Sequence, residues 1–330
     1  GNPYVTNEIT QKTAFKLRSD IIKNYYKDVS KLRRRLTFKN VEEVIIDIEN
    51  RLYKSIDQTQ EKPSISLEEL KDKLNFIKKE VILKHESLFI EEIQELIDKV
   101  DIFGYYFASL DIRQDSSIHN MVFEKIVAQT FDKKTLDIYK KQSDEEKIKF
   151  LFSKEFNVLN TEFNHPKVLN TIGSMTAMKS IQKSNGEKGC HRYIISHNES
   201  PLNILEVFKM FSFIGWKNPT VDIIPLFETI DDLKNSISVM DKVYNNRSYR
   251  KHLELRNNEQ TIMLGFSDGT KDGGYLTANW NILKSKEDLI KVSSKHGIKL
   301  KFFDGRGGPP ARGGGNTHQF YSSMAGIVDT

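Results

Sequence analysis

Residues 221–229 read Val-Asp-Ile-Ile-Pro-Leu-Phe-Glu-Thr, an apolar run that ends in a carboxylate and a hydroxyl. A helical pattern follows at once, over residues 230–244. Short apolar or β-branched runs of this kind recur along the chain, at Tyr105–Ile112, Tyr193–Ser196, Val221–Phe227, Thr261–Phe266 and Ile298–Phe303. Because helical stretches such as residues 202–214 separate them, the pattern predicts parallel βα units. An open doubly wound sheet and a (β/α) barrel both fit this alternation.

The residues before this alternation have the pattern of helices. Between Thr10 and Leu36, apolar side chains fall at steps of three and four residues. Ser66-Leu67-Glu68-Glu69 has the pattern of a capping box that opens a further helix. We therefore expect a helical scaffold over residues 1–102, and βα units with helical insertions over residues 103–330.

The composition excludes several classes of protein. With 38% hydrophobic and 29% charged side chains among 330 residues, the chain is expected to be globular rather than disordered. No apolar run approaches the roughly 20 residues of a membrane span, so no membrane segment is expected. The net charge of +5 is too weak by itself to indicate nucleic-acid binding. The single cysteine, Cys190, cannot form an intrachain disulfide, and we expect a cytoplasmic protein.

Polar residues end or follow four of the five predicted strands. They are Arg113-Gln114-Asp115, Glu228-Thr229, Ser267-Asp268-Gly269-Thr270-Lys271-Asp272 and Asp304-Gly305-Arg306. Because the carboxyl ends of parallel strands meet at one edge of a sheet, these groups should converge on one functional rim.

Two carboxylates of this rim, Glu228 and Asp268, are candidate ligands of one hard divalent cation. Mg²⁺ and Mn²⁺ accept a few protein carboxylates and leave positions for water and substrate oxygens. Helix capping or ordinary ion pairing would explain the same residues. Lys271 fits either an anion-binding role or a salt bridge with Asp268, and Asp115, Asp272 and Asp304 are expected to pair with nearby cations. His197 lacks the spacing of a zinc ligand, so we expect it to be structural.

A loop rich in glycine and arginine, residues 304–316, follows the last predicted strand. Its backbone amides and the guanidinium groups of Arg306 and Arg312 suit a phosphate or carboxylate ligand. The loop matches neither a P-loop nor a dinucleotide-binding Gly-x-Gly-x-x-Gly, so a nucleotide cofactor has no support. An anion-binding enzyme loop, an Arg-Gly-Gly nucleic-acid-binding segment and a structural glycine loop remain open on these residues alone.

Several separate blocks, in this order, resemble those of the phosphoenolpyruvate carboxylase family. They are residues 1–6, 110–115, 225–229, 265–272 and 305–314, so the resemblance spans essentially the whole chain. It implies a mostly helical protein around a phosphoenolpyruvate/pyruvate-type (β/α)₈ barrel, of which this chain holds about five strands. The implied reaction is the carboxylation of phosphoenolpyruvate by bicarbonate, which gives oxaloacetate and phosphate and supplies the tricarboxylic acid cycle. Mg²⁺ or Mn²⁺ is the implied cofactor.

The resemblance also implies roles for individual residues. Glu228 and Asp268 would hold the metal, and Arg113 and Arg306 would bind the phosphoryl and carboxylate oxygens. Arg312 would lie beside bicarbonate and would contact an inhibitory dicarboxylate. The remaining implied site residues, which position the anions, are Lys271, Gly307 and Gly308.

This chain departs from the family pattern at Asp304, where most members have a histidine. The family's N-terminal part and its later barrel strands are also missing from the chain. We therefore expect a central fragment from a distinct bacterial branch, inactive alone, whose parent enzyme is a homo-oligomer (a tetramer in the family). The alternatives are another phosphotransferase with this type of barrel and an Arg-Gly-Gly nucleic-acid binder.

Overall fold

The computed structural model describes residues 5–56, 62–154, 156, 164–305 and 316. The chain divides into two compact units. The first comprises Gly1–Leu110 with Gly173–His191, and the second comprises Asp111–Ile172 with Arg192–Thr330. Within the described residues, no helix is long and apolar enough to cross a membrane.

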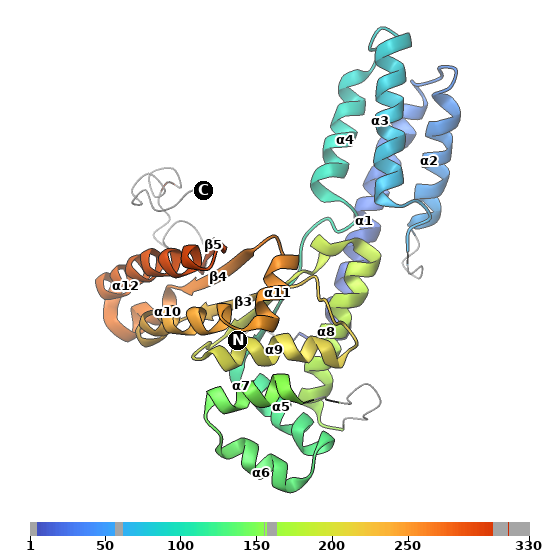
Figure 1. The fold of residues 1–330 in the computed structure, drawn as a ribbon. Coiled ribbons are helices and arrows are strands. Elements are labelled where there is room, and N and C mark those ends of the chain that lie inside the picture. Colours follow the sequence, from blue (N-terminus) through green and yellow to red (C-terminus); the bar gives the residue numbers. More distant parts are fainter. Residues whose placement is uncertain (1–4, 57–61, 155, 157–163, 306–315, 317–330) are drawn as a thin grey trace. The chain divides into compact units, whose positions relative to one another are not determined.

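The first unit is a helical bundle. It contains α1 (Asn7–Arg33), α2 (Glu42–Ser55), α3 (Leu67–Lys84) and α4 (Ile90–Phe103), together with the C-terminal part of α8 (Pro166–Asn185) and the short 3₁₀ helix η1 (Glu187–Gly189). Helices α1–α4 bury one continuous apolar core, which includes Ile22, Ile48, Leu74 and Ile93. The long antiparallel helices are visible in Figure 1.

Only half of the predicted capping box at the start of α3 forms. The hydroxyl of Ser66 accepts a hydrogen bond from the amide of Glu69, 3.1 Å away. The carboxylate of Glu69 binds Arg51 of α2 instead, with Nη2 and Oε2 2.7 Å apart. In a complete capping box, the Glu69 carboxylate would accept a hydrogen bond from the backbone amide of Ser66. Here that carboxylate binds Arg51 of the neighbouring helix instead.

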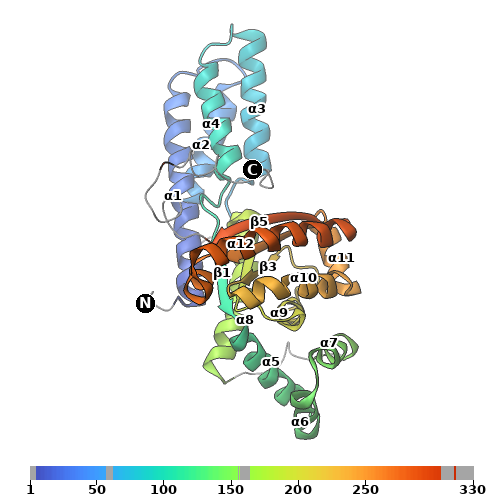
Figure 2. The same ribbon diagram turned by 90° about the vertical axis from the view of Figure 1, so that its left-hand side faces the viewer.

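The second unit contains a parallel sheet with the strand order β1-β2-β3-β4-β5. The strands are β1 (Asp111–Asp115), β2 (Arg192–Ser196), β3 (Asp222–Phe227), β4 (Glu259–Gly265) and β5 (Lys299–Gly305). Its helices are α5 (Ser116–Thr130), α6 (Lys133–Lys141), α7 (Asp144–Ser153), α9 (Pro201–Phe213), α10 (Ile230–Tyr244), α11 (Arg247–Leu255) and α12 (Ser267–Lys295). Helices α10 and α12 lie side by side, as Figures 1 and 2 show.

The two faces of this sheet have different neighbours. Tyr193 of β2 points toward the helices, where its ring contacts Phe211 of α9. Ile194, its neighbour in the strand, belongs to a small apolar cluster with Ile224 and Leu226. Because side chains alternate along a strand, this cluster marks the face turned away from the helices, which we call the inner face.

The predicted fold class is confirmed, because the described chain is mostly helical and carries a parallel sheet of five strands. The bounds of the first strand were wrong. The predicted strand 105–112 is largely loop, and β1 begins only at Asp111. Tyr105 belongs to the core of the helical unit rather than to a strand. Its hydroxyl donates to the carbonyl of Ile65, 3.0 Å away.

Candidate active site

Glu228 lies directly after β3, on the inner face of the sheet. Strand alternation places it on the same face as Ile224 and Leu226, at the carboxyl end of the strand. Its side chain is only 7% exposed. A Cβ at Gly265, at the end of the neighbouring strand β4, would lie 3.2 Å from its Cγ. The glycine therefore leaves room for a carboxylate that the sheet would otherwise crowd.

Arg113 of β1 reaches this carboxylate. Its Nη2 donates to Oε1 of Glu228 across 3.0 Å, and half of the arginine side chain remains exposed. The register pairs Arg113 with Ile194, which puts the guanidinium on the inner face as well. Arg113 and Glu228, which are far apart in the sequence, thus meet at the carboxyl edge of the sheet. The guanidinium of Arg113 compensates the buried negative charge of Glu228.

Asp268 and Lys271 lie in the first turns of α12, directly after β4. They form an exposed ion pair, with Nζ and Oδ1 2.8 Å apart. The carbonyl oxygen of Glu228 lies 3.4 Å from the position that a Cβ on Gly269 would take. The start of α12 therefore approaches the backbone of Glu228, although no direct contact joins the two carboxylates.

The donor chemistry of these carboxylates suits a hard divalent cation. Within the described residues, no group of three or more histidine, cysteine or acidic side chains is arranged to hold a metal ion. Mg²⁺ needs less, because one or two carboxylates and substrate oxygens commonly complete its coordination. A carboxylate accepts about four hydrogen bonds, so Glu228 keeps acceptor capacity beside Arg113. The pair Glu228 and Asp268 fits such an ion.

His197, which follows β2, also lies at this rim, where it contacts Glu228 and Asp115. Its backbone amide donates to Oε2 of Glu228 across 3.0 Å. Its ring Nδ1 lies 2.7 Å from Oδ2 of Asp115, and this hydrogen bond raises the pKa of His197. Burial raises the pKa of Asp115, but hydrogen bonds from Ser117 and His197 outweigh burial and leave that pKa below its usual value. The position after a parallel strand was the signal in the sequence that could have identified His197.

The other acidic residues of the rim have different partners. Asp304, at the end of β5, forms an ion pair with Lys286 of α12, at 2.8 Å from Oδ1 and 3.0 Å from Oδ2. The prediction of a cationic partner is confirmed for Asp304, although that partner lies in the middle of α12. For Asp272 it stays a prediction; the Oδ2 of Asp272 accepts from the backbone amide of Ile230 at 3.2 Å.

Four of the predicted site residues, Arg306, Gly307, Gly308 and Arg312, lie outside the described residues. The described part of the rim contains groups from the ends of all five strands. Their chemistry combines a buried carboxylate, a half-exposed guanidinium, an imidazole and an exposed Asp–Lys pair. Such a rim can bind an anion and a cation side by side.

Comparison with known proteins gives one consistent result. The family model described as phosphoenolpyruvate carboxylase matches residues 46–324. The phosphoenolpyruvate carboxylase of Nitrosomonas europaea is 37% identical over 247 residues, which cover 69% of this chain and 25% of the relative. That of Nitrosomonas eutropha is 37% identical over 245 residues, with the same coverage. That of Gloeobacter violaceus is 32% identical over 237 residues, again covering 69% and 25%. The chain therefore spans about a quarter of the length of these curated relatives.

Proposed function

Since the chain belongs to the phosphoenolpyruvate carboxylase family, we propose that its strand-end rim serves the carboxylation of phosphoenolpyruvate by bicarbonate. One observation carries the proposal. The buried carboxylate of Glu228 lies at a strand end, where Arg113 binds one oxygen and the amide of His197 binds the other. A fixed carboxylate beside a guanidinium suits a substrate that carries phosphate and carboxylate groups together with a divalent cation.

Glu228 and Asp268 would hold Mg²⁺ or Mn²⁺ at this rim. When bound, such an ion acts as a Lewis acid toward phosphoryl and enolate oxygens. Lys271, paired with Asp268, would orient that carboxylate and add a positive charge near the anions. Residues 103–330 would carry the chemistry, and residues 1–102 would serve as a helical scaffold.

The arginines would bind the substrates. Arg113 would bind phosphoryl or carboxylate oxygens with its half-exposed guanidinium. By the family resemblance, Arg306 would share this task with the backbone of Gly307 and Gly308. Arg312 would stabilise the bicarbonate-derived anion and would bind an inhibitory dicarboxylate.

The proposed reaction has two bond-forming steps. A bicarbonate oxygen attacks the phosphoryl group of phosphoenolpyruvate, which gives carboxyphosphate and the enolate of pyruvate. Carboxyphosphate then releases carbon dioxide and phosphate, and the enolate carbon bonds to carbon dioxide to form oxaloacetate. The enzyme would thus be a carbon–carbon lyase that fixes carbon dioxide and replenishes the tricarboxylic acid cycle. A homotetramer in the cytoplasm stays a prediction.

The test is a bicarbonate-dependent oxaloacetate assay on the complete reading frame that encodes the chain. Asp268→Asn should lower the rate by about a thousandfold, since a metal contributes several kcal/mol of charge stabilisation and each 1.36 kcal/mol is tenfold. Asp288→Asn is the matched control. Asp288 lies in the same helix and pairs with a lysine three residues later, Lys291, at 3.0 Å. It should retain the wild-type rate.

The outcomes separate the proposal from its alternatives. Activity that needs both bicarbonate and a divalent cation, and that only Asp268→Asn removes, supports carboxylation. Consumption of phosphoenolpyruvate without bicarbonate would overturn the proposal in favour of a phosphotransferase. Salt-sensitive binding of nucleic acid without turnover would favour the Arg-Gly-Gly alternative.

A further inference from the structure

His197 has a backbone conformation that is uncommon for residues other than glycine. Its φ is +49°, in the left-handed region, which is unfavourable for a non-glycine residue. Its side chain is 61% exposed, so core packing does not hold it there. A strained residue of this kind persists only where surrounding contacts over-determine it.

Two contacts from the end of β1 and the start of α5 hold His197 in place. The ring Nδ1 lies 2.7 Å from Oδ2 of Asp115, and the backbone carbonyl accepts a hydrogen bond of 2.5 Å from Oγ of Ser116. Asp115 is itself fixed, because its Oδ1 accepts from the amide and the hydroxyl of Ser117 at 2.9 and 2.6 Å. The N-cap of α5 thus anchors the residue that follows β2.

This conformation directs the amide of His197 at Glu228. The amide donates to Oε2 at 3.0 Å, and Arg113 donates to Oε1 at 3.0 Å. Two donors from neighbouring strand ends therefore fix the plane of a carboxylate whose side chain would otherwise lose rotamer freedom on binding a ligand.

We propose that His197, locked by Asp115, is a positioning residue that preorganises Glu228 for a divalent cation. The inference rests on the proposed function, in which Glu228 is a metal ligand. Helix capping alone does not explain the arrangement, because Oδ1 of Asp115 already caps α5. The second oxygen of Asp115, Oδ2, binds the ring of His197. The backbone amide of His197 in turn donates to Glu228. Outer-shell partners of this kind typically change metal affinity by about 10–100-fold when they are removed.

The experiment measures the affinity of the complete protein for Mn²⁺ alone, by electron paramagnetic resonance, in two variants of His197. Valine is β-branched and does not tolerate the left-handed conformation, so His197→Val should weaken Mn²⁺ binding by about tenfold or more. Asparagine tolerates that conformation, and its amide can donate to Asp115. His197→Asn should therefore retain most of the affinity.

A matched control comes from a second histidine–aspartate pair. His296 Nε2 lies 2.9 Å from Oδ1 of Asp241, and His296 has a negative φ as the C-cap of α12. His296→Val should leave Mn²⁺ affinity unchanged. Thermal unfolding of all variants shows whether the valine variant is folded at the temperature of the measurement, and the asparagine variant keeps the test valid if it is not.

The results distinguish this inference from the proposed function. Wild-type Mn²⁺ affinity in a folded His197→Val variant of an active carboxylase would overturn the inference alone. An equal loss in His197→Val and His197→Asn would also overturn it, because the imidazole itself would then be required. A loss confined to His197→Val, in a protein that makes no oxaloacetate, would support the positioning of Glu228 and overturn only the carboxylation.

Discussion

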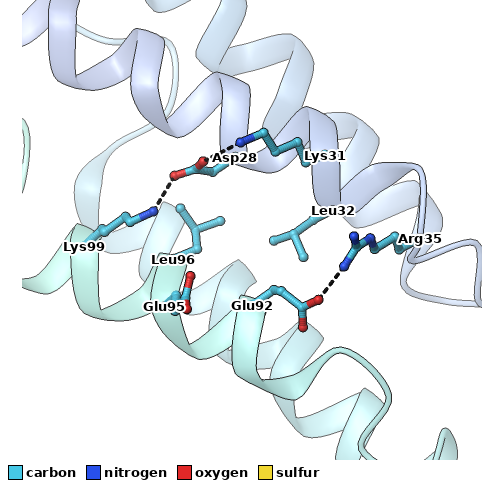
Figure 3. Close-up of a pocket in the computed structure, with 8 residues that line it drawn as sticks. All are labelled: Asp28, Lys31, Leu32, Arg35, Glu92, Glu95, Leu96 and Lys99. Carbon is cyan, nitrogen blue, oxygen red and sulfur yellow. Dashed lines mark hydrogen bonds and ion pairs between the residues drawn. The ribbon is translucent and has the colours of Figure 1, made fainter.

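An arginine–glutamate pair occurs in both units of the chain, but its surroundings differ. In the helical unit, Arg35 binds Glu92 across a groove between α1 and α4, and the two side chains are 54% and 40% exposed (Figure 3). In the sheet unit, Arg113 binds Glu228, and that glutamate is only 7% exposed. The two arginines are about equally exposed, so the pairs differ in the burial of the glutamate.

The groove of the helical unit has the character of a solvated surface. Asp28 lies between two lysines, at 3.9 Å from Lys31 and 3.0 Å from Lys99. The leucines that line it belong to the core that holds the helices together. Exposed pairs of this kind contribute about 0–1 kcal/mol, whereas a buried carboxylate depends strongly on its partners. Glu228 is therefore expected to depend on its arginine far more than Glu92 does.

Among substitutions compared at one pH, the largest effect on stability is expected at the Lys286–Asp304 pair of the sheet unit. Lys286 is 5% exposed and Asp304 is 24% exposed, so Lys286→Met should remove a buried cation from beside a poorly hydrated carboxylate. Loss of one partner of a fully buried pair costs about 3–5 kcal/mol; partial exposure of Asp304 lowers our expectation to about 2–3 kcal/mol. The free energy of unfolding in urea measures the change.

Lys99→Met in the helical unit is the matched control, because Lys99 is 46% exposed in its pair with Asp28. It should change stability by less than about 1 kcal/mol. The double variant Lys286→Met/Asp304→Asn should recover part of the loss, since it removes the negative charge of Asp304 as well. Equal losses at Lys286 and Lys99 would show that burial does not distinguish the two units.

Much of the sheet could be predicted, because strand and helix patterns alternate clearly after residue 190. The predicted helix 230–244 coincides with α10. The first strand was predicted too early in the chain, because an apolar run in the sequence does not show whether it packs in the helical core or in the sheet. Tyr105 packs among the helices, whereas the polar residues Asp111–Asp115 form the strand.

The site was only partly visible in the sequence, for a related reason. Glu228 and Arg113 were found because polar residues at strand ends converge on one edge. The contact of His197 with Glu228 could not be predicted, because it is made by a backbone amide, which every residue except proline carries. The partner of Asp304 could not be predicted, because Lys286 approaches it only when α12 packs against β5.

A second comparison concerns the pH dependence of two buried glutamates. Glu206 of α9 accepts a hydrogen bond from Tyr139, and burial raises its pKa to about 8. Between pH values of about 4.5 and 8, the folded state keeps a proton that the unfolded state releases, so stability falls as pH rises. Relative to Glu206→Gln, the wild type should lose up to about 1.4 kcal/mol per pH unit in this window.

Glu49 of the helical unit should show the opposite sign. Burial alone would raise its pKa, but hydrogen bonds from Ser30 and Arg33 lower it below the usual value. Its contribution is therefore present above the unfolded pKa and is lost as pH falls through the folded pKa. Urea unfolding of Glu206→Gln and Glu49→Gln at several pH values measures both trends. Parallel pH profiles for the two variants would contradict the assignment.

The smallest effect is expected in the groove of Figure 3. Glu92→Gln removes the charge that faces Arg35, but water solvates both side chains, and the guanidinium also lies 5.5 Å from the ring centroid of Phe89. We expect a loss of less than about 1 kcal/mol, which salt should diminish further. Urea unfolding at low and high salt measures it. A salt-independent loss as large as that of Lys286→Met would mean that this exposed pair is held as firmly as the buried one, and burial could no longer explain the difference between the units.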